Sequence, residues 1–197
     1  RDWSSNVCSS DLLIAILIDN QSTSNGLSLG NEVSARIGDI IVRNASKKLF
    51  TGGTITNSEQ GNIKITNSGD TYTNMADITN TKGDISIANN KDGTFQLGGS
   101  ITNLDGNTTI ANNSNYFIHS GTISNSGGNT TITNANGVLY EYGEITNVGG
   151  DLTIDNKGSY TEITKAITNE GGSINILNSS GHLNITSIAA ITNTSDS

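Results

Sequence analysis

A short pattern recurs along most of the chain at intervals of 22–24 residues. Each copy contains an Ile-Thr/Ser-Asn segment, a turn with glycine, and a second segment of alternating apolar and polar residues that also ends in asparagine. The first segment ends at Asn57, Asn80, Asn103, Asn125, Asn147, Asn169 and Asn193. The second ends at Asn20, Asn44, Asn67, Asn89, Asn112, Asn134, Asn156 and Asn178. A fixed period of this length is typical of repeat architectures, so the chain is expected to form one solenoid.

The copy at residues 100–121 shows how the pattern predicts strands. Thr108 and Ile110 alternate with Thr109 and Ala111, as in a strand that buries one face. The segment around Ile101 has the same alternation, and a coil of this length leaves room for a third strand. We therefore predict an all-β fold, a right-handed three-sided parallel β-helix (β-solenoid) of about eight coils of ~22 residues.

Parallel stacking of the coils would place equivalent residues above one another at a spacing of roughly 4.8 Å. One column is then expected inside at Ile18, Val42, Ile65, Ile87, Ile110, Ile132, Ile154 and Ile176. A second is expected at Ile55, Ile78, Ile101, Ile123, Ile145, Ile167 and Ile191. Because buried amides need partners, both asparagine columns are predicted to form side-chain ladders in which each amide donates to the next.

Composition narrows the classes of partner. Hydrophobic residues make up only 32% of the chain, which would fit disorder, but the regular spacing of isoleucine argues against it. The net charge is −8 and no basic patch is present, so nucleic acid and anionic membrane surfaces are not expected partners. The apolar run at residues 13–18 is far shorter than the ~20 residues that span a membrane, so no membrane insertion is expected.

The first twelve residues do not follow the repeat. They resemble the translated read-through of a common DNA-sequencing adapter, and we interpret residues 1–12 as a non-structural artefact and 13–197 as one β-helix segment. The only cysteine, Cys8, lies in this stretch, so no disulfide or zinc framework is expected. Neither end shows an atypical capping coil, so we expect a fragment truncated at both ends. Open coil edges can pair with other chains, which predicts end-to-end self-association.

The third side of the coil is the least regular in sequence and carries every aromatic residue outside residues 1–12. Four aromatic residues recur there at steps of 22 or 23: Phe50, Tyr72, Phe95 and Phe117. This spacing predicts an internal aromatic stack. The alternative is a partly exposed stripe that stacks on sugars or a receptor, for which Tyr116, Tyr140 and Tyr142 are the possible surface contacts.

Few residues could carry catalysis. Glu141 and Glu162 lie on neighbouring coils of the third side with Lys165 nearby, and two carboxyl groups about 5 Å apart could support retaining glycoside hydrolysis. Solvated charges on an outward face are the favoured interpretation. His119 and His182 are isolated from each other and from any acid pair, so no metal site is expected. We expect no cofactor and no enzymatic activity.

The repeat pattern Ile-Thr-Asn-x-x-Gly-Asp-Ile/Thr/Leu-x-Ile-x-Asn resembles the shaft of filamentous-haemagglutinin-like adhesins of two-partner secretion, including the leukotoxin-family filamentous adhesins of anaerobic bacteria. The resemblance covers residues 13–197. It implies export through an outer-membrane transporter, display at the bacterial cell surface, and a structural rod that presents distal binding regions and mediates adhesion to host or other cells. The alternatives are a carbohydrate-active β-helix enzyme and a carbohydrate- or receptor-binding face within the shaft.

Overall fold

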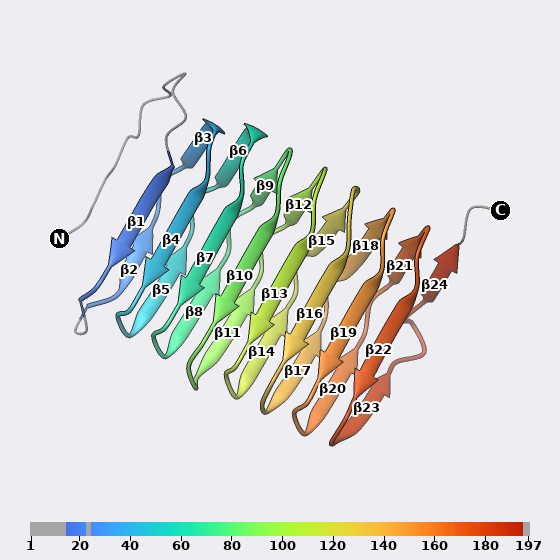
Figure 1. The fold of residues 1–197 in the computed structure, drawn as a ribbon. Helices are drawn as coiled ribbons and strands as arrows, with labels where there is room; N and C mark the ends of the chain where they lie inside the picture. The colour runs from blue at the N-terminus through green and yellow to red at the C-terminus, as the bar shows by residue number, and fades with distance from the viewer. Residues whose placement is uncertain (1–14, 23–24, 195–197) are drawn as a thin grey trace.

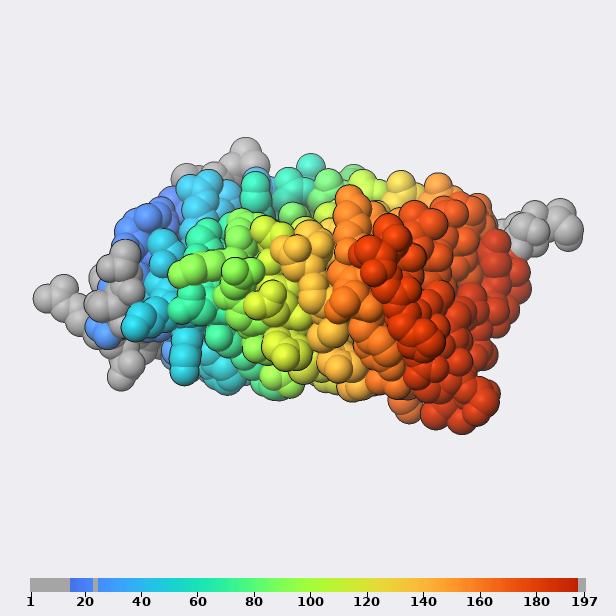
Figure 2. All heavy atoms as spheres, turned by 90° about the horizontal axis from the view of Figure 1, so that it is seen from below, coloured from blue at the N-terminus to red at the C-terminus, as the bar shows by residue number. Residues whose placement is uncertain are grey.

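The computed structural model describes residues 15–22 and 25–194, which form 24 β-strands and no helix. Each coil contributes one strand to each of three parallel eight-stranded sheets, and consecutive coils lie side by side along the molecule (Figure 1). The all-β, three-sided parallel β-helix of eight coils is therefore confirmed. The space-filling view shows a body elongated along the stacking direction, from the first coil to the last (Figure 2).

The strands fall into three sets by position in the coil. The first sheet contains β1 (Ile16–Asn20), β4 (Ile40–Asn44), β7 (Ile63–Asn67), β10 (Ile85–Asn89), β13 (Thr108–Asn112), β16 (Thr130–Asn134), β19 (Leu152–Asn156) and β22 (Ile174–Asn178). The second sheet contains β2 (Leu27–Leu29), β5 (Lys48–Thr51), β8 (Thr71–Asn74), β11 (Thr94–Leu97), β14 (Tyr116–His119), β17 (Val138–Glu141), β20 (Tyr160–Ile163) and β23 (His182–Ile185). The third sheet contains β3 (Val33–Ile37), β6 (Ile55–Gln60), β9 (Ile78–Asn80), β12 (Ile101–Asn103), β15 (Thr122–Asn125), β18 (Glu144–Val148), β21 (Ile167–Glu170) and β24 (Ile191–Thr194).

Strand register confirms the alignment of both isoleucine columns, but the prediction that every member is buried is wrong for Ile191, which lies on the last coil and is 40% exposed. Ile110 pairs with Ile87 on one side and with Ile132 on the other, and all three side chains are fully buried. In the third sheet the column begins one coil earlier than the sequence indicated, because Val33 is buried and pairs with Ile55. Burying such a side chain contributes roughly 1.5–3 kcal/mol, so the two columns supply much of the hydrophobic stabilisation.

Glycine is required where the third sheet turns into the first. Gly106 has φ 137°, a region that side chains rarely adopt, and a Cβ atom there would lie 2.1 Å from the carbonyl oxygen of Gly83 on the preceding coil. Close stacking of backbone on backbone at this corner therefore explains why the sequence repeats glycine at it.

The proposed artefact at residues 1–12 lies outside the described residues. In the described part of the chain, no helix is long and apolar enough to cross a membrane.

Candidate functional site

The second sheet sends alternate side chains into the core and out to solvent. Inside, Tyr72 stacks on Phe95 with ring centroids 5.3 Å apart, and Phe95 stacks on Phe117 at 4.7 Å. Phe50 was expected to continue this stack, but that prediction is wrong. Leu49, not Phe50, pairs with Tyr72, so Phe50 points outward and is 41% exposed.

The outer face of the second sheet changes character midway along the helix. In the first half Phe50 on β5 is an outward aromatic residue, but the outward residues on β8 and β11 are small or polar: Thr71, Thr73, Thr94 and Gln96. From β14 onward they are mainly aromatic or aliphatic: Tyr116, Ile118, Val138, Tyr140 and Tyr160. A general preference of strands for β-branched and aromatic residues does not explain why the tyrosines gather in one half. This segregation makes the outer face the strongest candidate site.

Six side chains on the last coils form a connected cluster, which we call the tyrosine face: Tyr140, Tyr142, Tyr160, Glu162, His182 and Asn184. Tyr140 contacts Tyr142 with ring centroids 5.5 Å apart and Tyr160 at 6.0 Å, while Tyr160 stacks on His182 at 5.8 Å. Of the three possible surface contacts, Tyr140 and Tyr142 thus belong to this cluster. Tyr116 is 53% exposed but does not belong to it. Tyr116 lies on β14, two coils before β20, and its neighbour on the next coil is Val138.

Hydrogen bonds hold the polar members of the tyrosine face in place. The hydroxyl of Tyr142 donates to Oε2 of Glu162 at 2.9 Å, and Nδ2 of Asn184 donates to Oε1 of Glu162 at 3.1 Å. Nδ2 of Asn184 also reaches the hydroxyl oxygen of Tyr160 at 3.5 Å. Partial burial of the ring and the hydrogen bond to Glu162 raise the pKa of Tyr142 to about 12. The cluster is therefore pre-organised around one carboxylate.

The structure contradicts the proposed catalytic carboxylate pair. Glu141 pairs with Ile163 and is fully buried, whereas Glu162 pairs with Tyr140 on the outer face of the same sheet. The two residues are 21 positions apart, one fewer than the local period, and a shift of one residue turns a side chain to the other face. Lys165 is exposed in the corner after β20. Glu141, Glu162 and Lys165 therefore do not form one site.

The sequence suggested that His119 is isolated from acidic residues, and that prediction is wrong. His119 pairs in register with Glu141, both side chains are fully buried, and Nδ1 of His119 shares a hydrogen bond with Oε1 of Glu141. The same Oε1 accepts the backbone N–H of Gly143 at 3.2 Å. Nε2 of His119 and Oε2 of Glu141 have no partner. The spacing of 22 residues between them was the signal that could have found this pair, since it equals the repeat.

The asparagine column of the first sheet forms the predicted ladder. Each Nδ2 donates to Oδ1 of the equivalent residue on the next coil, at 2.7–3.4 Å, through Asn20, Asn44, Asn67, Asn89, Asn112, Asn134, Asn156 and Asn178. Most of these amides also donate to a backbone carbonyl of their own corner, as Asn134 does to Asn136 at 2.7 Å. The column is thus linked from coil to coil along the first sheet, and it is buried except at its ends, where Asn20 and Asn178 are only partly buried.

The column of the third sheet forms a ladder only in its second half. Side-chain bonds link four asparagines at 2.7–3.2 Å: Asn125, Asn147, Asn169 and Asn193. The prediction is wrong for Asn57, Asn80 and Asn103, whose Nδ2 groups donate to backbone carbonyls of the corner instead. Their Oδ1 atoms have no partner. The laddered amides donate to corner carbonyls as well, as Asn147 does to Gly150 at 2.9 Å, and the ladder occurs where the corner sequence is Gly-Gly rather than a single glycine.

A further column of polar side chains runs along the exposed corner, at Asp39, Asn62, Asp84, Asn107, Asn129, Asp151 and Ser173. Each side-chain oxygen before Ser173 accepts the backbone N–H of the next member at 2.8–3.0 Å. The N–H and hydroxyl of Ser173 both donate to Asp151 and hold its pKa below the usual range. Aspartate and asparagine both occur in this column because each offers a side-chain oxygen that accepts this bond.

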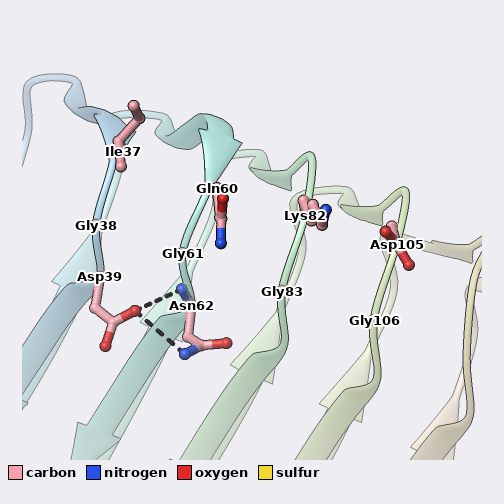
Figure 3. A pocket seen from close by; sticks show the side chains of 10 residues that line it. All are labelled: Ile37, Gly38, Asp39, Gln60, Gly61, Asn62, Lys82, Gly83, Asp105 and Gly106. Atoms are coloured by element: carbon pink, nitrogen blue, oxygen red, sulfur yellow. Dashed lines mark hydrogen bonds between the residues drawn. The ribbon is translucent and has the colours of Figure 1, made fainter. Parts of the chain in front are cut away.

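An open groove of about 510 Å³ follows the same corner in the first half of the helix (Figure 3). It is lined by Ile37, Gly38, Asp39, Gln60, Gly61, Asn62, Lys82, Gly83, Asp105 and Gly106. Oδ1 of Asp39 accepts two hydrogen bonds from Asn62, one from the backbone N–H at 2.8 Å and one from the side-chain Nδ2 at 3.2 Å. Glycine backbone forms much of its wall, so we attribute the groove to the glycine corners. Among the described residues, no cluster of three His, Cys, Asp or Glu could hold a metal ion.

The architecture and the tyrosine face define a parallel β-helix protein with a lateral aromatic surface. Comparison with family models, curated proteins and solved structures gives no match to this chain.

Proposed function

We propose that this chain is a structural rod segment of a large secreted bacterial surface adhesin, which spaces and presents distal binding regions. The observation that carries the proposal is the uninterrupted stacking of eight coils in register in all three sheets. Each coil adds roughly 4.8 Å along the axis, so length is set by coil number. Export through an outer-membrane transporter, surface location and adhesion are supported by the resemblance of the repeat to filamentous-haemagglutinin-like shafts.

The internal bonding suits a rod that has to stay straight and intact. The ladder of the first sheet links each coil to the next from Asn20 to Asn178, in addition to the strand pairing. Because each neutral hydrogen bond contributes about 0.5–1.5 kcal/mol, the ladder adds resistance to separation at every coil interface. Each coil contacts only its neighbouring coils, so coils can be added or removed without disturbing distant parts of the chain, and the length of a shaft can vary.

Removal of one complete coil tests the rod proposal. Deletion of residues 108–129 joins Asn107 to Thr130, which pairs with Thr108, so the register is preserved. We expect a folded protein, by far-ultraviolet circular dichroism, whose longest dimension in X-ray scattering is shorter by about 4.8 Å. Deletion of residues 108–118 is the control, because half a coil breaks the register. Loss of β-structure in both variants would contradict a modular rod.

Surface location needs a separate test. Antibodies raised against the purified chain should label intact cells of the source bacterium as strongly as permeabilised cells. Labelling only after permeabilisation would contradict a surface adhesin, whatever the outcome of the deletion experiment.

A binding face within the shaft is the second candidate function, and the tyrosine face is the observation that favours it. Tyrosine supplies a large, rigid contact area with a polar tip, and it is enriched at binding surfaces for that reason. An enzymatic function has no comparable support, because its carboxylate pair is divided between the core and the surface.

A further inference from the structure

We propose that the tyrosine face binds an arginine side chain carried by a basic segment of a partner protein. The proposal deepens the second candidate function, a binding face within the shaft. It rests on the rod proposal in one respect only, because a partner has to reach the tyrosine face from the side of the rod.

The tyrosine rings offer the first half of an arginine site. Tyr140 makes an interplanar angle of 31° with Tyr142 and of 59° with Tyr160, so the three rings do not form one flat layer. Tyr142 is 37% exposed and Tyr140 and Tyr160 are half-buried, so part of each ring is accessible from solvent. A cation within about 6 Å of a ring centroid is attracted by the negative face of the ring, and the flat guanidinium group also stacks on it.

Glu162 offers the second half. Its Oε2 and Oε1 each accept one hydrogen bond, from Tyr142 and from Asn184, which fixes the plane of the carboxylate. A carboxylate has about four acceptor sites, so each oxygen keeps one for an incoming donor. Arginine can fill both with two parallel N–H groups while its plane rests on a ring. A lysine ammonium is a point charge and cannot match both carboxylate oxygens in the same planar way, and a quaternary ammonium has no N–H to donate to them.

The charges around the face favour a cation. In the described part of the chain, no lysine or arginine forms an ion pair with Glu162. The outward positions of β14, β17, β20 and β23 contain no basic residue besides His182. The chain as a whole carries a net charge of −8, which attracts basic partners over longer distances. Lys165 is the nearest basic residue along the chain, and its removal should strengthen binding of an arginine ligand.

Titration of the full chain with short peptides tests the proposal. The probe is a blocked hexapeptide of alternating glycine and arginine, and the comparison peptides replace arginine by lysine or by the neutral isostere citrulline. With labelled tyrosine rings followed by NMR near physiological ionic strength, the arginine peptide should shift the signals of Tyr140, Tyr142 and Tyr160. We expect the lysine peptide to bind about fivefold more weakly and the citrulline peptide to cause no shift.

Matched variants separate the site from general charge attraction. Glu162→Gln should weaken arginine-peptide binding about tenfold, because a charge-assisted hydrogen bond is lost. Glu170→Gln removes the same charge from an exposed glutamate of β21 and should change binding less than about twofold. Tyr140→Ala should weaken it about fivefold, and Gln96→Ala, on the same sheet three coils before β20, should not.

Several results would overturn the proposal. Equal losses in Glu162→Gln and Glu170→Gln would show attraction to net charge only. Choline that shifts the same rings as strongly as the arginine peptide would show a quaternary ammonium site, and shifts with a neutral oligosaccharide alone would show a sugar site. The variant lacking residues 108–129 retains all six members of the tyrosine face. If it folds and shortens without binding the peptide, the arginine proposal fails while the rod proposal stands.

Discussion

The buried pair of His119 and Glu141 gives the sharpest test of the structure. The two side chains occupy adjacent positions of one inward column, between Leu97 and Ile163, and all four are fully buried. Replacing either polar residue by leucine leaves the other without its partner in the core. Breaking such a buried pair costs about 3–5 kcal/mol, so each single variant should lose that much free energy of unfolding.

The double variant should be far more stable than the sum of the single variants. Leucine at both positions would continue the apolar column, and each buried leucine contributes roughly 1.5–3 kcal/mol. Against this, the backbone N–H of Gly143 loses its acceptor, which costs about 1–3 kcal/mol. We expect the double variant to lie within about 2 kcal/mol of the parent, so the coupling energy should be at least about 4 kcal/mol.

Urea denaturation followed by circular dichroism and by tyrosine fluorescence measures these energies, provided that the two transitions coincide. Ile118→Leu is the control, because Ile118 lies next to His119 on β14 but points outward, and it should change stability by less than about 0.5 kcal/mol. Single variants as stable as the parent, or a double variant as unstable as the sum, would refute the burial of a coupled pair.

Three other predictions follow from the core, the ladder and the tyrosine face. Ile110→Asp buries an unpaired charge and should lower the free energy of unfolding by several kcal/mol, whereas the exposed Thr109→Asp should be tolerated; similar melting temperatures would contradict the inward assignment. Asn134→Ala interrupts the ladder between Asn112 and Asn156 and should cost about 1–3 kcal/mol, while Asn136→Ala, at an exposed position, should cost much less; equal urea midpoints would argue against a structural ladder. Because the pKa of Tyr142 is raised to about 12, its protonated form stabilises the fold, and this contribution is present below the unfolded pKa near 10 and lost as the pH rises through about 12. Glu162→Gln should lower this pKa in an NMR titration of the ring, and an unchanged value would show that the hydrogen bond does not act on it.

The sequence determined the architecture because each repeat of about 22 residues forms one complete coil. The isoleucine columns and the ladder from Asn44 to Asn178 could be predicted from spacing alone, since identical residues at one period must stack in a parallel β-helix. Strict alternation in the first and third sheets also identified which side chains are buried, as at Thr108 and Ile110.

Only the tertiary structure decided which side chains of the second sheet face the core. Corner lengths differ by one residue between coils, and a shift of one residue reverses every side chain of a strand. For that reason Phe50 lies outside the aromatic stack, and Glu141 and Glu162 lie on opposite faces. The same register brought His119 to Glu141 in the core and Tyr142 to Glu162 on the surface. The 22-residue spacing of His119 and Glu141 equals the repeat and could have indicated their pairing, but Tyr142 and Glu162 are 20 residues apart, so only the alignment of neighbouring coils reveals the second pair.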